Sequence, residues 1–139
     1  MIPVETVLTE ARSWIGTPWH HQARLKGVGV DCIGLIVGVC SALGLPLQDS
    51  QNYARYPDGV ALGKELARQL MERSGPPEPG DVMLFRISRM PQHVGLCTPL
   101  GIIHAHQGCK RVVETAMSAQ WRSHLIARYS IPGVAPWQS

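Results

Sequence analysis

A cysteine and two later histidines are the residues of this 139-residue sequence best suited to chemistry. Cys32 directly follows Asp31, where a glycine-containing loop gives way to a long apolar run. A thiol in the first turn of a helix faces unpaired backbone N–H groups and the positive end of the helix dipole, and both favour the thiolate. We therefore predict that Cys32 is a nucleophile, with a buried structural cysteine as the alternative.

His93 and His104 lie on two predicted strands that are joined by a tight turn around residues 98–100. With a two-residue loop, odd positions on the first strand share a face with even positions on the second. In that register His93 can act as the base for Cys32, and His104 can orient the far nitrogen of His93. His106 lies on the same face and is the alternative orienting residue, whereas a three-residue loop would turn His104 to the opposite face.

A zinc site is the main competing interpretation of the same region, because several residues there have side chains that bind zinc: His93, Cys97, His104, His106 and Cys109. Their spacing matches none of the usual zinc motifs, and the sequence has neither a CxxC nor an HExxH motif. We therefore expect no metal and no cofactor. The four cysteines are expected to be free thiols, with a Cys97–Cys109 disulfide as the alternative in an oxidising compartment.

The helical patterns lie in the first half of the chain, and the strand patterns lie in the second half. Helical spacing of apolar residues predicts helices over residues 3–15, 32–43 and 60–73. Strand-like segments follow at residues 81–87, 93–98, 101–106, 111–115 and 125–130. This order predicts one α+β domain over residues 1–139, with N-terminal helices packed on a five- or six-stranded antiparallel sheet and a flexible tail at 133–139.

The segment between the first two helices, residues 16–30, is predicted to be a loop. Trp19 and His20 lie in it and are candidates for lining a substrate cleft beside Cys32. Arg24, further along the same loop, is expected to be solvated. Asp31, at the end of this segment, is expected to cap the second helix by accepting a hydrogen bond from a first-turn N–H group.

The composition excludes several classes of function. The net charge is only +3, and the sequence has no run of five or six basic residues, so we expect no nucleic-acid partner. The longest apolar run, residues 32–47, is too short and too interrupted by glycine to span a membrane. The first residues have no signal-peptide pattern, so we expect synthesis in the cytoplasm and delivery to any outside site by another route.

Several short motifs, taken in order, resemble the NlpC/p60 family of papain-like cysteine peptidases. They are Gly16-Thr17-Pro18-Trp19, Asp31-Cys32-Ile33-Gly34-Leu35, Pro77-Glu78-Pro79-Gly80-Asp81-Val82, His93-Val94-Gly95 and Ile102-Ile103-His104-Ala105. The resemblance extends from about residue 5 to residue 130. Residues 21–29 and 128–133 further resemble the branch found in phage tails and gene-transfer agents.

The resemblance implies a papain-like fold in which Cys32, His93 and His104 are catalytic. It also implies cleavage of peptidoglycan stem peptides, typically between γ-D-glutamate and a diamino acid, with Asp31 binding the free amine of an N-terminal L-alanine. The phage-like segments imply phage tail proteins as partners and a place on the virion tail, acting on the cell wall.

Two positions depart from the family pattern. Trp19 replaces the usual tyrosine, and Ile33 replaces the usual serine after the cysteine. These departures keep two alternatives open: a cell-wall-binding or structural tail module with weak or no catalysis, and a related cysteine amidase or acyltransferase.

Overall fold

A computed structural model of the chain describes residues 1–49, 60–87 and 90–138. The helices are α1 (Val4–Arg12), α2 (Cys32–Ala42), α3 (Val60–Gln69) and α4 (Ala119–His124). The strands are β1 (Arg24–Leu25), β2 (Gly29–Val30), β3 (Met71–Arg73), β4 (Val82–Ile87), β5 (Met90–Cys97), β6 (Gly101–His106), β7 (Arg111–Ala116) and β8 (Leu125–Ser130). The predicted α+β fold is confirmed, with helices against a six-stranded antiparallel sheet.

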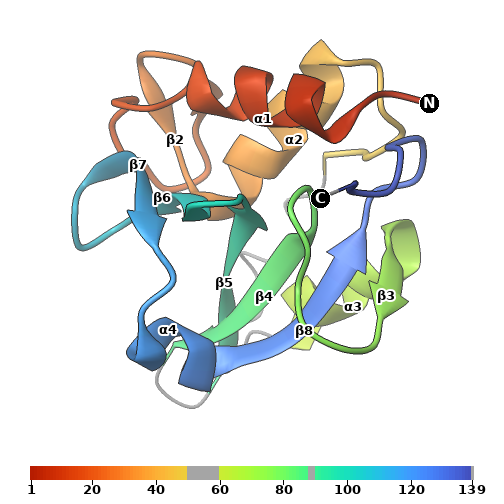
Figure 1. Cartoon of the computed structure of the whole chain (residues 1–139). Helices are drawn as coiled ribbons and strands as arrows, with labels where there is room; N and C mark the ends of the chain where they lie inside the picture. The colour runs from red at the N-terminus through yellow and green to blue at the C-terminus, as the bar shows by residue number, and fades with distance from the viewer. Residues whose placement is uncertain (50–59, 88–89, 139) are drawn as a thin grey trace.

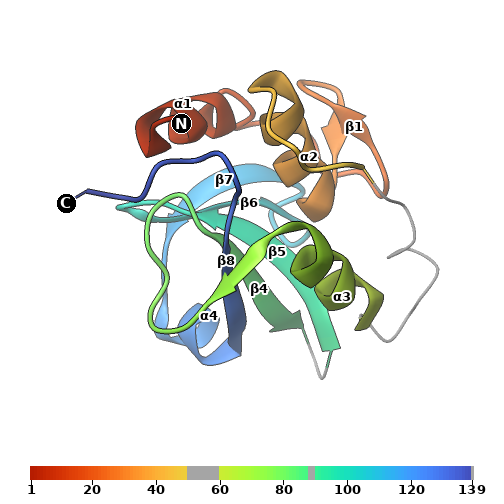
Figure 2. The ribbon, with the colours of Figure 1, turned by 90° about the vertical axis from the view of Figure 1, so that its right-hand side faces the viewer.

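The sheet has the strand order β3-β8-β4-β5-β6-β7, in which every neighbouring pair is antiparallel. Helices α1 and α2 lie together on one side of it, and α4 lies at its opposite end (Figure 1). The turned view shows α2 above the central strands and α3 beside them (Figure 2). The start of α2 therefore lies over the strands that carry the two histidines.

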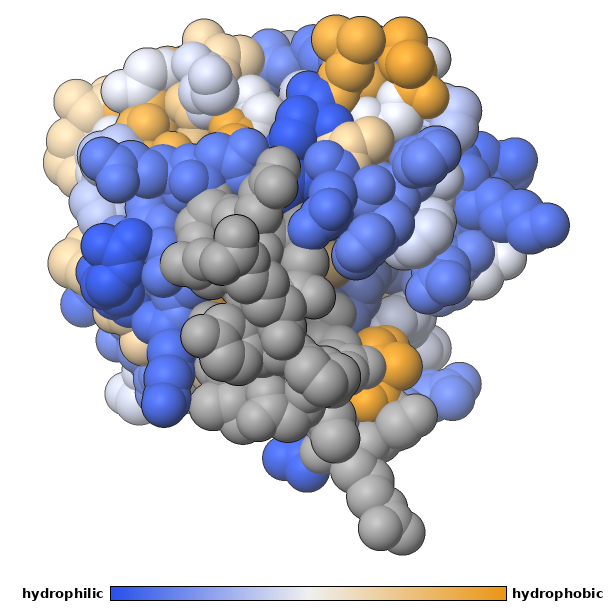
Figure 3. Space-filling view, turned by 180° about the vertical axis from the view of Figure 1, so that it is seen from behind, coloured by the Kyte–Doolittle hydropathy of each residue, from blue (hydrophilic) through white to orange (hydrophobic). Residues whose placement is uncertain are grey.

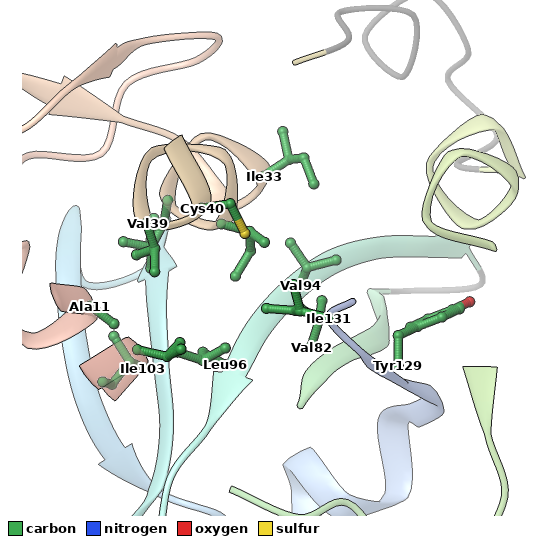
Figure 4. Packing of buried hydrophobic residues seen from close by; sticks show 14 of the residues in the cluster. Ala11, Ile33, Val39, Cys40, Val82, Val94, Leu96, Ile103, Tyr129 and Ile131 are labelled. Carbon is green, nitrogen blue, oxygen red and sulfur yellow. The ribbon is translucent and has the colours of Figure 1, made fainter. Parts of the chain in front are cut away.

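The alternation of side chains along the strands produces two apolar layers. Val82, Val94, Leu96 and Ile103 face α1 and α2, where they pack with buried residues of those helices such as Val39 (Figure 4). The intervening residues of the same strands form a second, smaller cluster on the other face: Met83, Phe85, Cys97 and Ile102. Whether a residue has an odd or an even position in its strand thus decides to which face of the sheet its side chain points.

The predicted helix over residues 60–73 ends earlier, at Gln69. Leu62, Leu66 and Leu70 are buried as the helical spacing predicts, but Met71 begins β3 and is 44% exposed. The three residues of β3 pair with residues 128–130 of β8. This pairing joins segments far apart in the sequence, so helical spacing alone could not reveal it.

Two small features are also new. The predicted loop over residues 16–30 contains the antiparallel β1–β2 hairpin, whose tip exposes Leu25 and Val28 to 61% and 66%. The view from behind shows an apolar patch at the corner where this hairpin lies (Figure 3). Helix α4 is capped by Ser118, whose hydroxyl oxygen accepts a hydrogen bond from the Trp121 N–H at 3.1 Å.

The two ends of the chain lie side by side. The Ile2 N–H donates to the Gly133 carbonyl at 2.9 Å, and the Ala135 N–H donates to the Ile2 carbonyl at 2.8 Å. Trp137 packs against the main core. The first part of the predicted tail is therefore attached to the domain. Within the described ranges, no helix has the length and apolar character needed to cross a membrane.

Candidate active site

Cys32 is the first residue of α2, and Asp31 caps that helix as predicted. Asp31 Oδ1 accepts the Gly34 N–H at 2.8 Å, and Oδ2 accepts the Gln22 N–H at 2.8 Å. These bonds satisfy a first-turn donor of α2 and attach the preceding loop to the helix start. The cysteine is therefore held at a defined point where loop, helix and sheet meet.

The Cys32 thiol lies against the sheet, because it is hydrogen-bonded to the backbone of Val94, the residue that follows His93. Burial, and after it the neighbouring Asp31 carboxylate, raise the pKa of this thiol to about 11. Backbone hydrogen bonds from Val94 and Ile33 lower the pKa, as does Arg24, but by less. The prediction of a thiolate was therefore wrong for the resting protein, since loss of hydration outweighs the helix terminus.

Arg24 is not solvated, contrary to the prediction. Its Nη1 lies 2.9 Å from Asp31 Oδ1 and its Nε lies 3.1 Å from Asp49 Oδ2, while its side chain is 18% exposed. The β1–β2 hairpin folds this guanidinium onto the start of α2. Gly34 leaves the necessary space, because a Cβ there would lie 2.7 Å from both Arg24 Nη1 and the Ala23 carbonyl oxygen.

The hairpin between β5 and β6 has the two-residue loop on which the predicted register depended. Thr98 and Gly101 exchange backbone hydrogen bonds of 3.0 and 3.2 Å, and Cys97 pairs with Ile102. His93 and His104 consequently share a face, and His93 Nε2 lies 2.7 Å from His104 Nδ1. The structure brings this pair of predicted site residues into direct contact.

His106 occupies a different position from the one required of an orienting residue. Its ring centre is 6.3 Å from that of His93, and its Nδ1 accepts the Cys109 N–H at 3.2 Å. The same nitrogen lies 3.2 Å from Cys109 Sγ. Of the two candidates for bonding His93, it is therefore His104 that does so.

A β-bulge and a glycine in β5 determine how the two imidazoles are oriented. Phe85 pairs with His93 and Arg86 with Pro91, so β5 has one extra residue, a β-bulge, immediately before His93. Such bulges turn side chains near functional sites. A Cβ at Gly95 would lie 2.5 Å from Ile102 Cδ1 and 3.2 Å from His104 Cβ, so only glycine leaves room for His104 to lie across β5.

Aromatic rings enclose the two histidines. The Trp121 ring centre is 5.3 Å from that of His93 and 5.1 Å from that of His104, and Phe85 lies 6.0 Å from His93. Burial, with a smaller effect of His106, lowers the pKa of His93 to about 4. Burial, followed by the effects of His93 and His106, lowers the pKa of His104 to about 3. Both imidazoles are therefore neutral at neutral pH.

Trp121 and Phe85 were not recognised as site residues from the sequence. The N-cap pattern of Ser118 before Trp121 is a usable signal for α4. It does not indicate where that helix packs.

Trp19 and His20 are positioned by their backbones next to the start of α2. The Trp19 N–H donates to the Lys110 carbonyl at 2.8 Å, and the His20 N–H donates to the Val30 carbonyl at 3.0 Å. Trp19 is half-buried against the main core, whereas His20 is exposed. The two residues predicted to contact substrate thus differ in the exposure of their side chains.

Other candidate sites lie away from the histidines or do not form. In the part of the chain that the structure describes, no group of three or more His, Cys, Asp or Glu side chains is arranged to hold a metal ion. All four cysteines are free thiols. A cavity of about 320 Å³ lies near the chain ends and is lined by Arg73, Arg128 and Trp137 among others, but by neither Cys32 nor His93.

Comparisons with known proteins define the class to which this fold and site belong. Residues 16–129 match the model of the NlpC/P60 family, so the chain belongs to that family. No curated protein matches the chain by sequence.

Solved structures of several proteins share the fold. An NLP/P60-family protein described as similar to a lipoprotein, from Staphylococcus aureus subsp. aureus Mu50, aligns with a TM-score of 0.69 and 20% identity over 92% of this chain. The chain spans only 41% of that protein. The NlpC/p60 domain of the peptidoglycan hydrolase SagA aligns with a TM-score of 0.66 and 21% identity, over 92% of this chain and 98% of that domain. The peptidoglycan hydrolase RipB from Mycobacterium tuberculosis aligns with a TM-score of 0.60 and 20% identity, over 91% of this chain and 63% of RipB.

Proposed function

We propose that this protein is a cysteine peptidase that hydrolyses peptidoglycan stem peptides at the bond between γ-D-glutamate and the diamino acid. The observation that supports it most is the 2.7 Å contact between His93 Nε2 and His104 Nδ1. The residue that follows His93 on β5, Val94, forms a backbone hydrogen bond with the Cys32 thiol. Membership of the NlpC/P60 family and the hydrolase activity named for SagA and RipB support the choice of substrate.

The protonation states favour a general-base mechanism. Cys32 enters the reaction as a thiol, since its pKa is raised, and His93 enters as a neutral imidazole, since its pKa is lowered. As the sulfur attacks the scissile carbonyl carbon, its proton passes to Nδ1 of His93, and His104 holds the other nitrogen. The N–H groups of Val94 and Ile33 stabilise the negative charge on the sulfur.

The tetrahedral intermediate then collapses. His93 returns the proton to the leaving amine as the C–N bond breaks, which leaves Cys32 acylated through a thioester. Water, deprotonated by His93, hydrolyses the thioester and releases the peptide acid. The Cys32 backbone N–H, at the start of α2, contributes to the oxyanion site.

In this proposal Asp31 binds the amine of the substrate and also caps α2. Its oxygens already accept hydrogen bonds from Gly34, Gln22 and Arg24. Trp19 and His20 complete the proposed contacts with substrate beside Cys32.

The direct test uses the tripeptide L-Ala-γ-D-Glu-diaminopimelate with chromatography of the products. We expect the wild-type protein to release L-Ala-D-Glu, and Cys32→Ala to lower kcat by about three orders of magnitude or more. Cys40→Ala is the matched control, because Cys40 is buried in the same helix further from its start. Equal turnover by the wild type and Cys32→Ala, or none by either, refutes the peptidase.

The raised thiol pKa favours one second candidate, a cell-wall-binding module that keeps the fold without catalysis. A thiol with a pKa of about 11 is a weak nucleophile on its own at neutral pH. This candidate predicts co-sedimentation with purified peptidoglycan but no release of soluble peptide, equally in the wild type and in Cys32→Ala.

The proposal extends to a phage tail as the place of action. It rests on the likeness of residues 21–29 and 128–133 to the phage-tail branch of the family. Detection of the protein in purified virions by mass spectrometry supports this location, and its absence from virions with activity in the cell extract refutes it.

A further inference from the structure

We infer that Thr115 is a positioning residue that keeps the proton of His104 on Nε2 and thereby leaves Nδ1 of His93 free to accept a proton. This inference deepens the proposed function, because it rests on His93 being the base for Cys32. Thr115 Oγ1 lies 3.4 Å from His104 Nε2, while His104 Nδ1 lies 2.7 Å from His93 Nε2. The three side chains thus form a line that ends at His93.

The contact between His93 and His104 contains one proton, so the neutral pair has two arrangements. In the first, His93 Nε2–H donates to His104 Nδ1, and His93 Nδ1 is bare and can take the proton of a thiol. In the second, His104 Nδ1–H donates to His93 Nε2, so His93 has its own proton on Nδ1 and cannot act as a base. Only the first arrangement is competent.

Thr115 favours the first arrangement because of where it lies. Strand β7 pairs Thr115 with Ile102 and Val113 with His104, so Thr115 lies on the same face as His104, diagonally across the two strands. In the competent arrangement His104 has an N–H at Nε2, and this imidazole is only 1% exposed. The Thr115 hydroxyl oxygen can accept that hydrogen bond, whereas in the second arrangement its O–H would donate to the bare Nε2. The hydroxyl matters more in the first arrangement, because the group that it satisfies there is a buried N–H.

Removing the hydroxyl should shift the balance toward the second arrangement. A buried N–H without an acceptor is rarer and more costly than a buried bare acceptor. In Thr115→Val the proton of His104 would therefore move to Nδ1, where His93 Nε2 accepts it. His93 would then have its proton on Nδ1, the nitrogen that must be bare to receive the Cys32 proton.

The test compares Thr115→Val with Thr115→Ser, which keeps the hydroxyl. The position of each imidazole proton is read from ¹⁵N NMR shifts of labelled histidine at pH 7 without substrate. We expect His104 to be protonated at Nε2 in the wild type and in Thr115→Ser, and a shift to Nδ1 in Thr115→Val. We expect kcat of Thr115→Val to fall about tenfold or more with KM unchanged, as the wrong imidazole tautomer dictates.

Two results would overturn the inference: a wild-type His104 with its proton on Nδ1, or an unchanged tautomer in a folded Thr115→Val. The wild-type spectrum decides the first point even if Thr115→Val does not fold. The spectra are also recorded in Cys32→Ala, which needs no activity. If no variant cleaves the tripeptide, the proposed peptidase fails, whereas the tautomer still supports or overturns the role of Thr115.

Discussion

The Arg24 guanidinium lies 2.9 Å from the Asp31 carboxylate, one residue before Cys32. This ion pair joins the β1–β2 hairpin to the first turn of α2. The Asp31 side chain is 5% exposed, so neighbouring hydrogen-bond donors rather than water stabilise its negative charge. The contact links this hairpin to the position of the candidate nucleophile.

Arg24→Ala should lower the free energy of unfolding by about 3 kcal/mol, because breaking a buried ion pair leaves the carboxylate without its guanidinium. Arg68→Ala is the matched control, since the Arg68 side chain is 62% exposed in its pair with Glu65 and solvent-exposed pairs contribute little to stability. Urea titration followed by circular dichroism measures both. Equal effects of the two substitutions would contradict a structural role for the Arg24–Asp31 pair.

Acid should destabilise the protein through the two histidines. Their folded pKa values, about 4 for His93 and about 3 for His104, lie below the usual 6.5. The unfolded chain therefore binds more protons than the folded chain below pH 6.5, so the free energy of unfolding falls as the pH drops from about 6.5 toward 4. The loss is on the order of a few kcal/mol, since one pKa unit corresponds to about 1.4 kcal/mol.

The pH series is measured by urea titration in the wild type, in a His93→Gln/His104→Gln double variant and in His124→Gln. The double variant should lose stability less steeply between pH 6.5 and 4, whereas His124→Gln should follow the wild type. Parallel curves for the wild type and the double variant would show that the buried imidazoles do not cause the acid sensitivity.

The four thiols should differ in their rates of alkylation. Cys109 is exposed and should react first with iodoacetamide at pH 7, whereas burial raises the pKa of Cys32, Cys40 and Cys97 to about 11, 12 and 11. Peptide mapping by mass spectrometry gives each rate, and labelling of Cys32 should accelerate as the pH approaches 11. Labelling of Cys32 at pH 7 as fast as Cys109 would show that the helix terminus prevails over burial.

Gly95→Ala should disturb the histidine pair directly. The new Cβ would meet Ile102 Cδ1 at 2.5 Å and His104 Cβ at 3.2 Å, so we expect about 1–3 kcal/mol of destabilisation and a loss of turnover. Gly63→Ala is the control, because among the described residues its Cβ would meet only Leu84 Cδ2, at 3.6 Å, and alanine favours a helix over glycine. Thermal unfolding and the tripeptide assay should separate the two variants; similar results would refute this account of Gly95.

Local patterns in the sequence were sufficient to predict most of the helices and strands. The Asp31 cap, the apolar helix after it and the alternating strands are each specified by residues within a few positions of one another. The two-residue loop after Thr98 determines the β5–β6 register by counting alone, which is why the shared face of His93 and His104 was predictable. The end of the third helix was not, because β3 exists only through its pairing with β8.

What the tertiary structure alone decided is the chemistry of those residues. The sequence placed Cys32 at a helix start, but burial against β5 sets its pKa, and burial depends on every element around it. Arg24 was expected to be solvated, but the β1–β2 hairpin places its guanidinium against Asp31. Thr115 and Trp121 meet His104 only because β7 and α4 return to the same face of the sheet. Hydration and long-range packing depend on the folded arrangement of the whole chain, whereas caps, turns and alternation depend on near neighbours.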